Sequence, residues 1–218
     1  MRRIPVTQRR AELVDAAIRV IARDGLAAAT TRAIVAEAGM PLGAFHYSFA
    51  SRDELVSAVI EQVTDSERLA AILHADHVDA QHPADIATVL TDGLEGYLAL
   101  LESAPSGELA LLEVALYAVR HDPDAVRTQW AVYRAASEEA LAYAAGIAGV
   151  RWTRPVAELA HSLTRSLDGL TLTWLADRDS DAARAYIAFT ATAFAALTTP
   201  AADPATPSPG GHDADRTR

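Results

Sequence analysis

The feature that most constrains the fold is the stretch 30–49, where two short segments of helix-forming residues flank a glycine. The first segment begins at Thr30 and Thr31, either of which can cap a helix. It ends at Gly39, which lets the chain reverse at a positive φ without a Cβ clash. The second segment covers residues 42–47. Two short helices joined at such a turn form a helix-turn-helix.

This motif has a defined geometry on DNA. The first helix must be short because it crosses the DNA backbone, and the second helix enters a major groove about 12 Å wide. We expect Met40 and Phe45 to bury the turn and the second helix against Ile34. The outer face of the second helix is then free to contact DNA.

The rest of the chain also predicts helices, and we expect an all-α fold. Alanine supplies roughly a fifth of the residues, and arginine, leucine and glutamate are further strong helix formers. No segment shows the sustained apolar and polar alternation of a strand. Ser51 and Glu54 form a capping box at the start of a long helix that runs past Arg68. The other expected helices cover 7–24, 31–38, 42–47, 84–102, 107–121, 124–146, 154–178 and 181–198, with Asp122 and Ser180 as caps.

The pattern divides the chain into three parts. A helix-turn-helix DNA-binding domain covers 1–52, and a larger helical domain covers 53–198. The tail, 199–218, is rich in proline, aspartate, alanine, threonine and glycine and lacks aromatic and large aliphatic residues. We expect this tail to be disordered.

Charge is distributed unevenly between these parts. The chain carries a net charge of −10, yet residues 1–52 hold eight arginines and four acidic residues, and the remainder carries −14. A basic N-terminal part suits contact with a polyanion, which the acidic part would repel. Several of these arginines, Arg19 and Arg23 among them, can instead simply solvate helix faces.

Composition also excludes several classes of protein. There is no cysteine, which excludes disulfides, thiol catalysis and cysteine-ligated metal centres. We find no signal peptide and no uncharged apolar run of a membrane span, and we expect a cytoplasmic protein. No phosphate-binding loop or catalytic motif is present, so we expect neither an enzyme nor a cofactor. The cluster of His74, Asp76, His77, Asp79 and His82 is interpreted as a solvated loop rather than a metal site.

Residues 7–55 resemble the DNA-binding domain of TetR-family transcriptional regulators. The resemblance depends on the order and spacing of many elements, and the remainder of the chain matches only as a helical body of the usual length. The matching residues are Leu13, Val14, Ala17, Gly25, Leu26, Thr31, Ile34, Ala38, Gly39, Met40, Gly43, Ala44, Phe45, Tyr47, Phe49, Ser51, Arg52, Glu54 and Leu55.

The resemblance implies a set of DNA contacts. Recognition-helix contacts fall on Leu42, Gly43, Ala44, His46 and Tyr47. Phosphate contacts fall on Thr31 and Arg32 at the start of the preceding helix, and on Arg52 at the start of the fourth helix.

The recognition helix departs from the family pattern. Leucine stands at position 42, often basic or polar in the family, and histidine at position 46, often tyrosine. Because the helix is poor in hydrogen-bond donors, we expect phosphate contacts and DNA shape to carry much of the affinity. The N-terminal Arg2, Arg3, Arg9 and Arg10 can add phosphate or minor-groove contacts.

The resemblance further implies a body that binds a small molecule and dimerises through its last two helices. Two apolar stripes suit a four-helix interface, although they can equally pack inside one subunit. They comprise Val156, Leu159, Leu163, Leu167, Leu170 and Trp174, and Ala183, Ile187, Ala191, Phe194 and Leu197.

Aromatic and polar residues within the apolar helices suggest a ligand site. His161 and Arg165, one turn apart, could fix an anionic or carbonyl group, or pair with Asp168 or a partner subunit. The expected ligand-binding residues are Tyr97, Tyr117, Trp130, Tyr133, His161, Arg165 and Trp174.

The leading hypothesis is a homodimeric repressor that binds a near-palindromic operator in double-stranded DNA and is released by a small-molecule ligand. The alternative is a helical interaction protein whose DNA-binding head is degenerate. The sequence does not identify the ligand, the operator or the regulated genes.

Overall fold

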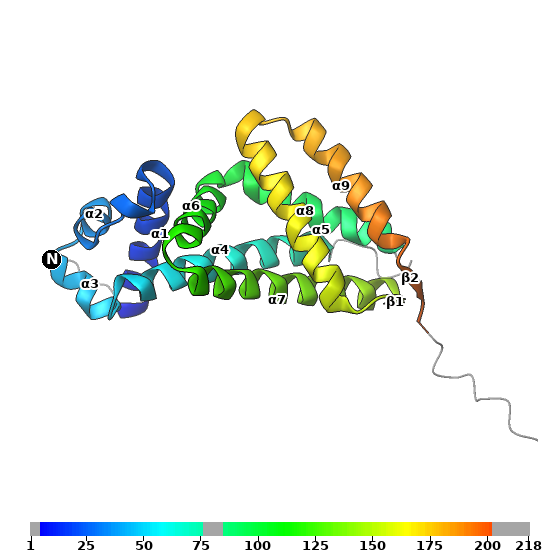
Figure 1. Ribbon diagram of the computed structural model, residues 1–218, viewed down its shortest axis with the longest axis horizontal. Helices are drawn as coiled ribbons and strands as arrows, with labels where there is room; N and C mark the ends of the chain where they lie inside the picture. The colour runs from blue at the N-terminus through cyan, green and yellow to red at the C-terminus, as the bar shows by residue number, and fades with distance from the viewer. Residues whose placement is uncertain (1–4, 76–84, 202–218) are drawn as a thin grey trace, which may run out of the picture.

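The computed structural model describes residues 5–75 and 85–201, and within these ranges it is all-α apart from one small strand pair (Figure 1). The N-terminal helices gather at one end of an elongated molecule, and the strands lie at the opposite end. The elements are α1 (Val6–Asp24), the 3₁₀ turn η1 (Leu26–Ala28), α2 (Thr31–Glu37), α3 (Leu42–Ser48), α4 (Arg52–Ala75), α5 (Ile86–Ser103), α6 (Pro105–His121), α7 (Pro123–Ala148), β1 (Val150–Trp152), α8 (Val156–Asp177), α9 (Ser180–Ala195) and β2 (Thr198–Pro200).

The expected helix-turn-helix is confirmed in α2 and α3. The Thr30 hydroxyl accepts a hydrogen bond from the backbone N–H of Ala33 at 3.2 Å, so Thr30 is the cap. Gly39 has φ of 63° and reverses the chain as the sequence predicts. Phe45 is 2% exposed and packs with Phe49, whose ring centre lies 5.7 Å away. The second helix is therefore held by its inner, aromatic face.

The capping box at the start of α4 is confirmed, except that the backbone N–H bonded by the Glu54 carboxylate belongs to Ala50 rather than to Ser51. The backbone N–H of Glu54 donates to the Ser51 hydroxyl at 3.0 Å. In return the Glu54 carboxylate accepts from the backbone N–H of Ala50 at 2.7 Å. These bonds satisfy N–H groups that a helix start leaves without intrahelical partners.

The body helices begin and end within three residues of their expected limits. Asp122 caps α7 as expected, accepting from the backbone N–H of Ala125 at 3.1 Å. The cap of α9 is Asp179 rather than Ser180, because the Asp179 carboxylate reaches the backbone N–H of Ala182 at 2.9 Å. No helix among the described residues is long and apolar enough to cross a membrane.

The end of the body corrects two expectations. Helix α9 stops at Ala195, and residues 198–200 form β2, which pairs antiparallel with β1. The predicted disordered tail therefore begins too early, since Thr199 and Pro200 belong to a strand. Strands of three residues are too short to show alternation, and the paired residues are distant in sequence, as in the pairing of Val150 with Pro200. The remaining tail, 202–218, lies outside the described residues.

A shared core joins the head to the body. Buried residues of α1, α2 and α3 form one cluster with Leu55 and Val59 of α4 and with Ala110 and Val114 of α6. Two further clusters fill the body, one between α5, α7, α8 and α9 and one between α5, α8 and α9. Packing thus runs across the predicted domain boundary at residue 52, through α4 and α6.

The apolar stripes expected to face a second subunit lie inside the protomer. Leu159, Leu170 and Trp174 of α8 and Ile187 of α9 are each less than 9% exposed. The alternative that these stripes pack within one chain is correct for them. The strongest apolar periodicity of a helix marks the face that packs inside its own protomer. A second, less apolar face that contacts another subunit is not detected by this periodicity.

Replacing Phe45 with alanine should destabilise the head, because a fully buried ring leaves a cavity. We expect the free energy of unfolding to fall by about 3–5 kcal/mol. Tyr47→Ala on the same helix is the matched control, and since Tyr47 is 81% exposed it should change stability by less than about 0.5 kcal/mol. Urea denaturation followed by circular dichroism measures both, and equal losses would contradict the assignment of inner and outer faces.

Candidate DNA interface and ligand cavity

The outer face of α3 is exposed and contains four of the five residues expected to contact DNA there. Tyr47 is 81% exposed and Leu42 is 43% exposed, and Gly43 and His46 are also exposed. Ala44 instead faces inward and is buried. Because it is so exposed, the Tyr47 ring contributes little to the packing of the head and is available to contact another molecule.

At the start of α2, Thr31 is half-buried and Arg32 is exposed. Within the part of the chain that the structure describes, Arg32 has no ion pair. Arg52 is different, because its guanidinium donates to the Ala29 carbonyl at 3.0 Å and also to the Leu26 carbonyl. Arg52 therefore ties the start of α4 to the turn before α2.

Arg10 and Glu54 hold the end of α3 against α1 and α4. The Arg10 guanidinium donates to the Glu54 carboxylate and to the Ser48 carbonyl, each at 2.8 Å. It also lies over the Phe49 ring, 4.1 Å from the ring centre. The backbone N–H of Ala50, followed by Arg10, lowers the pKa of Glu54. These contacts fix the recognition helix where it leaves the motif.

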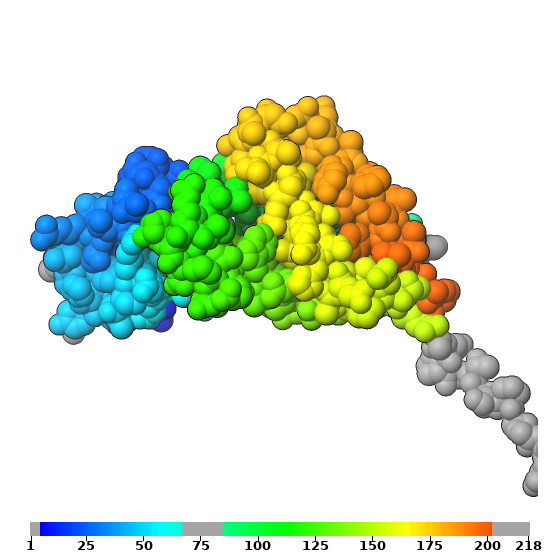
Figure 2. Space-filling view, in the orientation of Figure 1, coloured from blue at the N-terminus to red at the C-terminus, as the bar shows by residue number. Residues whose placement is uncertain are grey.

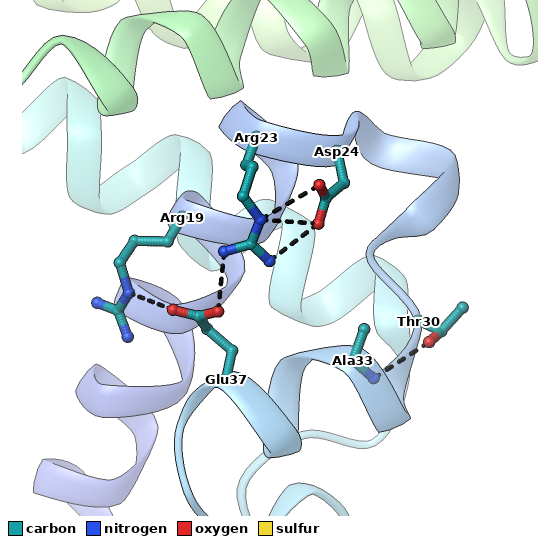
Figure 3. A network of polar contacts seen from close by, with 6 residues as sticks. All are labelled: Arg19, Arg23, Asp24, Thr30, Ala33 and Glu37. Carbon is teal, nitrogen blue, oxygen red and sulfur yellow. Dashed lines mark hydrogen bonds and ion pairs between the residues drawn. The ribbon is translucent and has the colours of Figure 1, made fainter.

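A second polar network ties α2 to α1 (Figure 3). Glu37, at the end of α2, accepts hydrogen bonds from Arg19 at 2.9 Å and from Arg23 at 3.0 Å. These bonds lower the pKa of Glu37, with Arg19 as the largest cause. Arg23 also bonds Asp24. Both arginines therefore join α1 to α2 through Glu37, whereas the alternative interpretation supposed that they only solvate helix faces.

The body contains a cavity of about 370 Å³. Its wall is mostly apolar, and the exposed Leu116 and Val119 of α6 and Leu172 of α8 lie at its opening. Figure 2 shows the surface hollowed between α6 and α8. This size and lining suit a small organic molecule.

Three of the expected ligand-binding residues line this cavity, namely Tyr97, Trp130 and Tyr133. The structure places the other four elsewhere. His161 and Arg165 lie on the exposed side of α8, where Arg165 donates to the His161 carbonyl. Tyr117 packs against the head core, and Trp174 is buried against α5 and α9.

Polar residues that sequence reasoning missed also line the cavity. Glu108 is 7% exposed and accepts a hydrogen bond from the Tyr97 hydroxyl at 3.3 Å. The Tyr97 hydroxyl also bonds Thr171. Thr64 is 5% exposed, and among the described residues its hydroxyl has no hydrogen-bond partner. The sequence does contain a signal for the buried acid. Glu108 lies three positions before Leu111 and four before Leu112, and so shares their apolar helix face.

Asp168 is the second acidic residue of the cavity wall. Burial, followed by the nearby Glu108 carboxylate, raises the pKa of Asp168 to about 6, and Arg165 opposes this rise only in part. A carboxyl with a raised pKa beside another acid is typical of functional sites.

The exposed side of α9 carries a separate pair of aromatic residues. Phe189 is 69% exposed and Tyr186 is 38% exposed. The rings of Tyr186 and Phe189 lie 6.4 Å apart. Exposed groups of large apolar side chains mark contact surfaces.

The histidine and aspartate cluster that we interpret as a solvated loop lies outside the residues whose side chains the structure describes. Among the residues that it does describe, no group of three or more histidine, aspartate or glutamate residues is arranged to hold a metal ion.

The raised pKa of Asp168 predicts how stability depends on pH. In the unfolded chain this carboxyl releases its proton near about pH 4, so stability falls as pH rises from there to about 6. Asp168→Asn should be more stable than the parent at about pH 8, by on the order of 1 kcal/mol after allowance for partial exposure. At about pH 4 the difference should vanish. Urea denaturation at the two pH values tests this, with the exposed Glu138→Gln as a control that should show no such trend.

Comparison with known proteins places this geometry in a family. Residues 13–59 match the model of bacterial regulatory proteins of the tetR family. Over 177 residues the chain is 30% identical to the HTH-type nicotine-responsive transcriptional repressor HdnoR of Paenarthrobacter nicotinovorans, covering 80% of this chain and 88% of HdnoR.

Solved structures agree with this match. A putative TetR-family regulator from Rhodococcus sp. superposes with a TM-score of 0.68 at 19% identity, over 86% of this chain and 99% of that one. The multidrug binding protein EbrR, complexed with imidazole, superposes with a TM-score of 0.58 at 30% identity, over 84% and 94%. The chain belongs to the TetR family of transcriptional regulators.

Proposed function

We propose that this regulator is a homodimeric repressor that leaves its operator when a small molecule enters the body cavity. The observation that carries the proposal is that α4 and α6 each belong to both the head core and the cavity wall. In α6, Ala110 and Val114 pack in the head, while Leu111 and Leu112 line the cavity. In α4, Val59 packs in the head and Thr64 lines the cavity.

This sharing gives a ligand a route to the DNA-binding surface. A molecule that displaces α6 or α4 must also move the head, because both helices are packed in its core. A change in the spacing of the two heads would lower the affinity for a near-palindromic operator. The coupling is reciprocal, so operator DNA must weaken ligand binding by the same factor.

Relatives support a ligand-responsive repressor. HdnoR is described as a nicotine-responsive repressor, and EbrR is described in complexes with imidazole and with malachite green. By analogy with them, the cavity of this chain is the place of an effector. Because the target is DNA, we place the protein in the cytoplasm.

For the DNA contacts we propose Thr31 and Arg32 on phosphates, and the outer face of α3 in the major groove. Leu42 can pack on a thymine methyl, and the Tyr47 ring and hydroxyl can reach the backbone or a base edge. Gly43 and His46 lie on the same exposed face. Ala44 and Arg52 serve mainly to seat and brace this face, since Ala44 is buried and Arg52 is bonded to backbone carbonyls.

For the dimer we propose the exposed face of α8 and α9. Two such helices from each protomer would form a four-helix interface that buries Phe189 and Tyr186. Exposed positions before and after them on α9 include the small residues Ala182, Ala185 and Ala193, which permit close approach.

The DNA contact is tested by a matched pair of arginine variants. Arg32→Ala should weaken binding to the DNA upstream of the protein's own gene and reduce the slope of log affinity against log salt by about 1, because one phosphate contact is lost. Arg151→Ala removes the same charge from β1 at the far end of the molecule and should leave affinity and slope unchanged (Figure 1).

Fluorescence anisotropy over a salt series measures both variants. Tyr47→Ala, which leaves the fold intact, should also weaken binding. Absent or salt-independent binding by a folded dimer would instead favour a helical interaction protein with a degenerate head.

The dimer is tested at its most exposed aromatic residue. Phe189→Asp places a charge in the proposed interface and should shift the protein from dimer to monomer at micromolar concentration in analytical ultracentrifugation. Leu42→Asp makes the same kind of change on α3 and should leave the dimer intact. A Phe189→Asp protein that sediments as a dimer would contradict this interface.

A further inference from the structure

The cavity is unusual in the sign of its charge. Its wall holds two acidic residues, Glu108 and Asp168, and none of the described residues that line it is an arginine or a histidine. The cation that lowers the pKa of Asp168 is Arg165, which lies on the exposed side of α8. The acids therefore face an apolar space into which no described residue places a cation.

Glu108 is the more deeply buried acid. The residue is 7% exposed, and among the described residues its carboxylate accepts a hydrogen bond from Tyr97 but has no ion pair. A buried carboxylate without a cation is unfavourable unless another group compensates it. Two acids close enough to repel one another increase that cost. An arriving positive charge would remove it.

Aromatic rings form the second part of the site. Trp130 and Tyr133 line the same cavity, with their ring centres 5.6 Å apart and nearly perpendicular. Indole and phenol rings bind flat apolar groups and also attract cations over their faces. The cavity thus combines negative charge with an aromatic wall.

An unsatisfied hydroxyl is the third feature of the cavity wall. Thr64 lines the cavity, is 5% exposed, and its hydroxyl oxygen has no partner among the described residues. Buried polar atoms almost always have a hydrogen-bond partner. A ligand with a polar group beside its ring would supply one.

We propose that the effector of this cavity is an aromatic organic cation whose charge lies between Glu108 and Asp168 and whose ring packs against Trp130 and Tyr133. This rests on the proposed function, because it names the ligand of the same cavity. An anion of equal size is excluded by the two acids, and a neutral molecule leaves their repulsion in place.

The test compares three probes of nearly equal size and different charge. These are 1-methylquinolinium, which is positive, its neutral isostere 1-methylnaphthalene, and the negative 1-naphthoate. Each is titrated into the full chain without DNA at about pH 8, where Asp168 is ionised. Isothermal calorimetry measures affinity, and quenching of tryptophan fluorescence supports it. We expect the cation to bind at least ten times more tightly than the neutral probe, and the anion not to bind.

Variants locate the charge. Glu108→Gln and Asp168→Asn keep the shape of the wall and should each weaken binding of 1-methylquinolinium at least tenfold, while leaving the affinity for 1-methylnaphthalene unchanged. The unchanged neutral probe and far-ultraviolet circular dichroism establish that the cavity is still folded. Glu113→Gln on the same helix removes an acid that does not line the cavity and should change neither affinity.

The outcomes separate this inference from the proposed function. Equal or tighter binding of the neutral or negative probe overturns the cation, as does the absence of binding by all three, and the operator assay is unaffected by either result. If the protein does not bind the operator but does bind the cation through Glu108, the proposed repressor function is wrong and the proposed cation site is supported.

Discussion

The structure depends on how tightly α6 packs between the head and the cavity. At Gly107 the helix approaches α4 so closely that a Cβ there would lie 3.3 Å from a methyl of Val63. One turn later Ala110 is fully buried in the head core. Small residues at both points leave no space for α6 to shift alone. Because packed interiors transmit strain rather than absorb it, a displacement on the cavity side of α6 must be shared by the head.

The arginines of the head are used mainly within the protein. Arg10, Arg19 and Arg23 are bonded to acidic side chains, and Arg52 is bonded to backbone carbonyls. The positive count of residues 1–52 therefore overstates the charge available to phosphate. This agrees with a recognition helix poor in donors, for which shape and a few contacts must suffice. Repulsion between the acidic body and the duplex would still favour contact at this end.

Sequence alone predicted the parts of the fold that are local. The Thr30 cap, the positive φ at Gly39 and the pairing of Ser51 with Glu54 are decided within a few residues, so spacing was enough to find them. The strand pair was missed because β1 and β2 are separated by two helices. The interface stripes were misplaced for a related reason, since periodicity finds the buried face of a helix without saying what buries it.

Local sequence patterns also predicted the residues of the cavity only in part. Aromatic residues drew attention to Tyr97, Trp130 and Tyr133, which do line it. Polar residues on an apolar helix predict ligand contacts at His161 and Arg165, yet their phase on α8 turns them outward. Asp168, only three residues beyond Arg165, has the phase that turns it inward. Which polar residue of a helix faces a cavity depends on tertiary packing. A difference of one or two positions along the helix is enough to turn a side chain from the cavity to solvent.

The acids of the cavity have a consequence for selectivity. The free energy lost by holding Glu108 and Asp168 in an apolar wall is already included in the folding stability of the protein. An entering cation therefore gains the attraction of both carboxylates without reorganising them, as in other preorganised sites. A neutral molecule of the same shape receives only the contribution of apolar burial. Charge thus selects among molecules that enter the hollow between α6 and α8, and shape then selects among the cations. Because α6 carries Glu108 on the cavity side and Ala110 on the head side, the same attraction acts directly on the helix that holds the head.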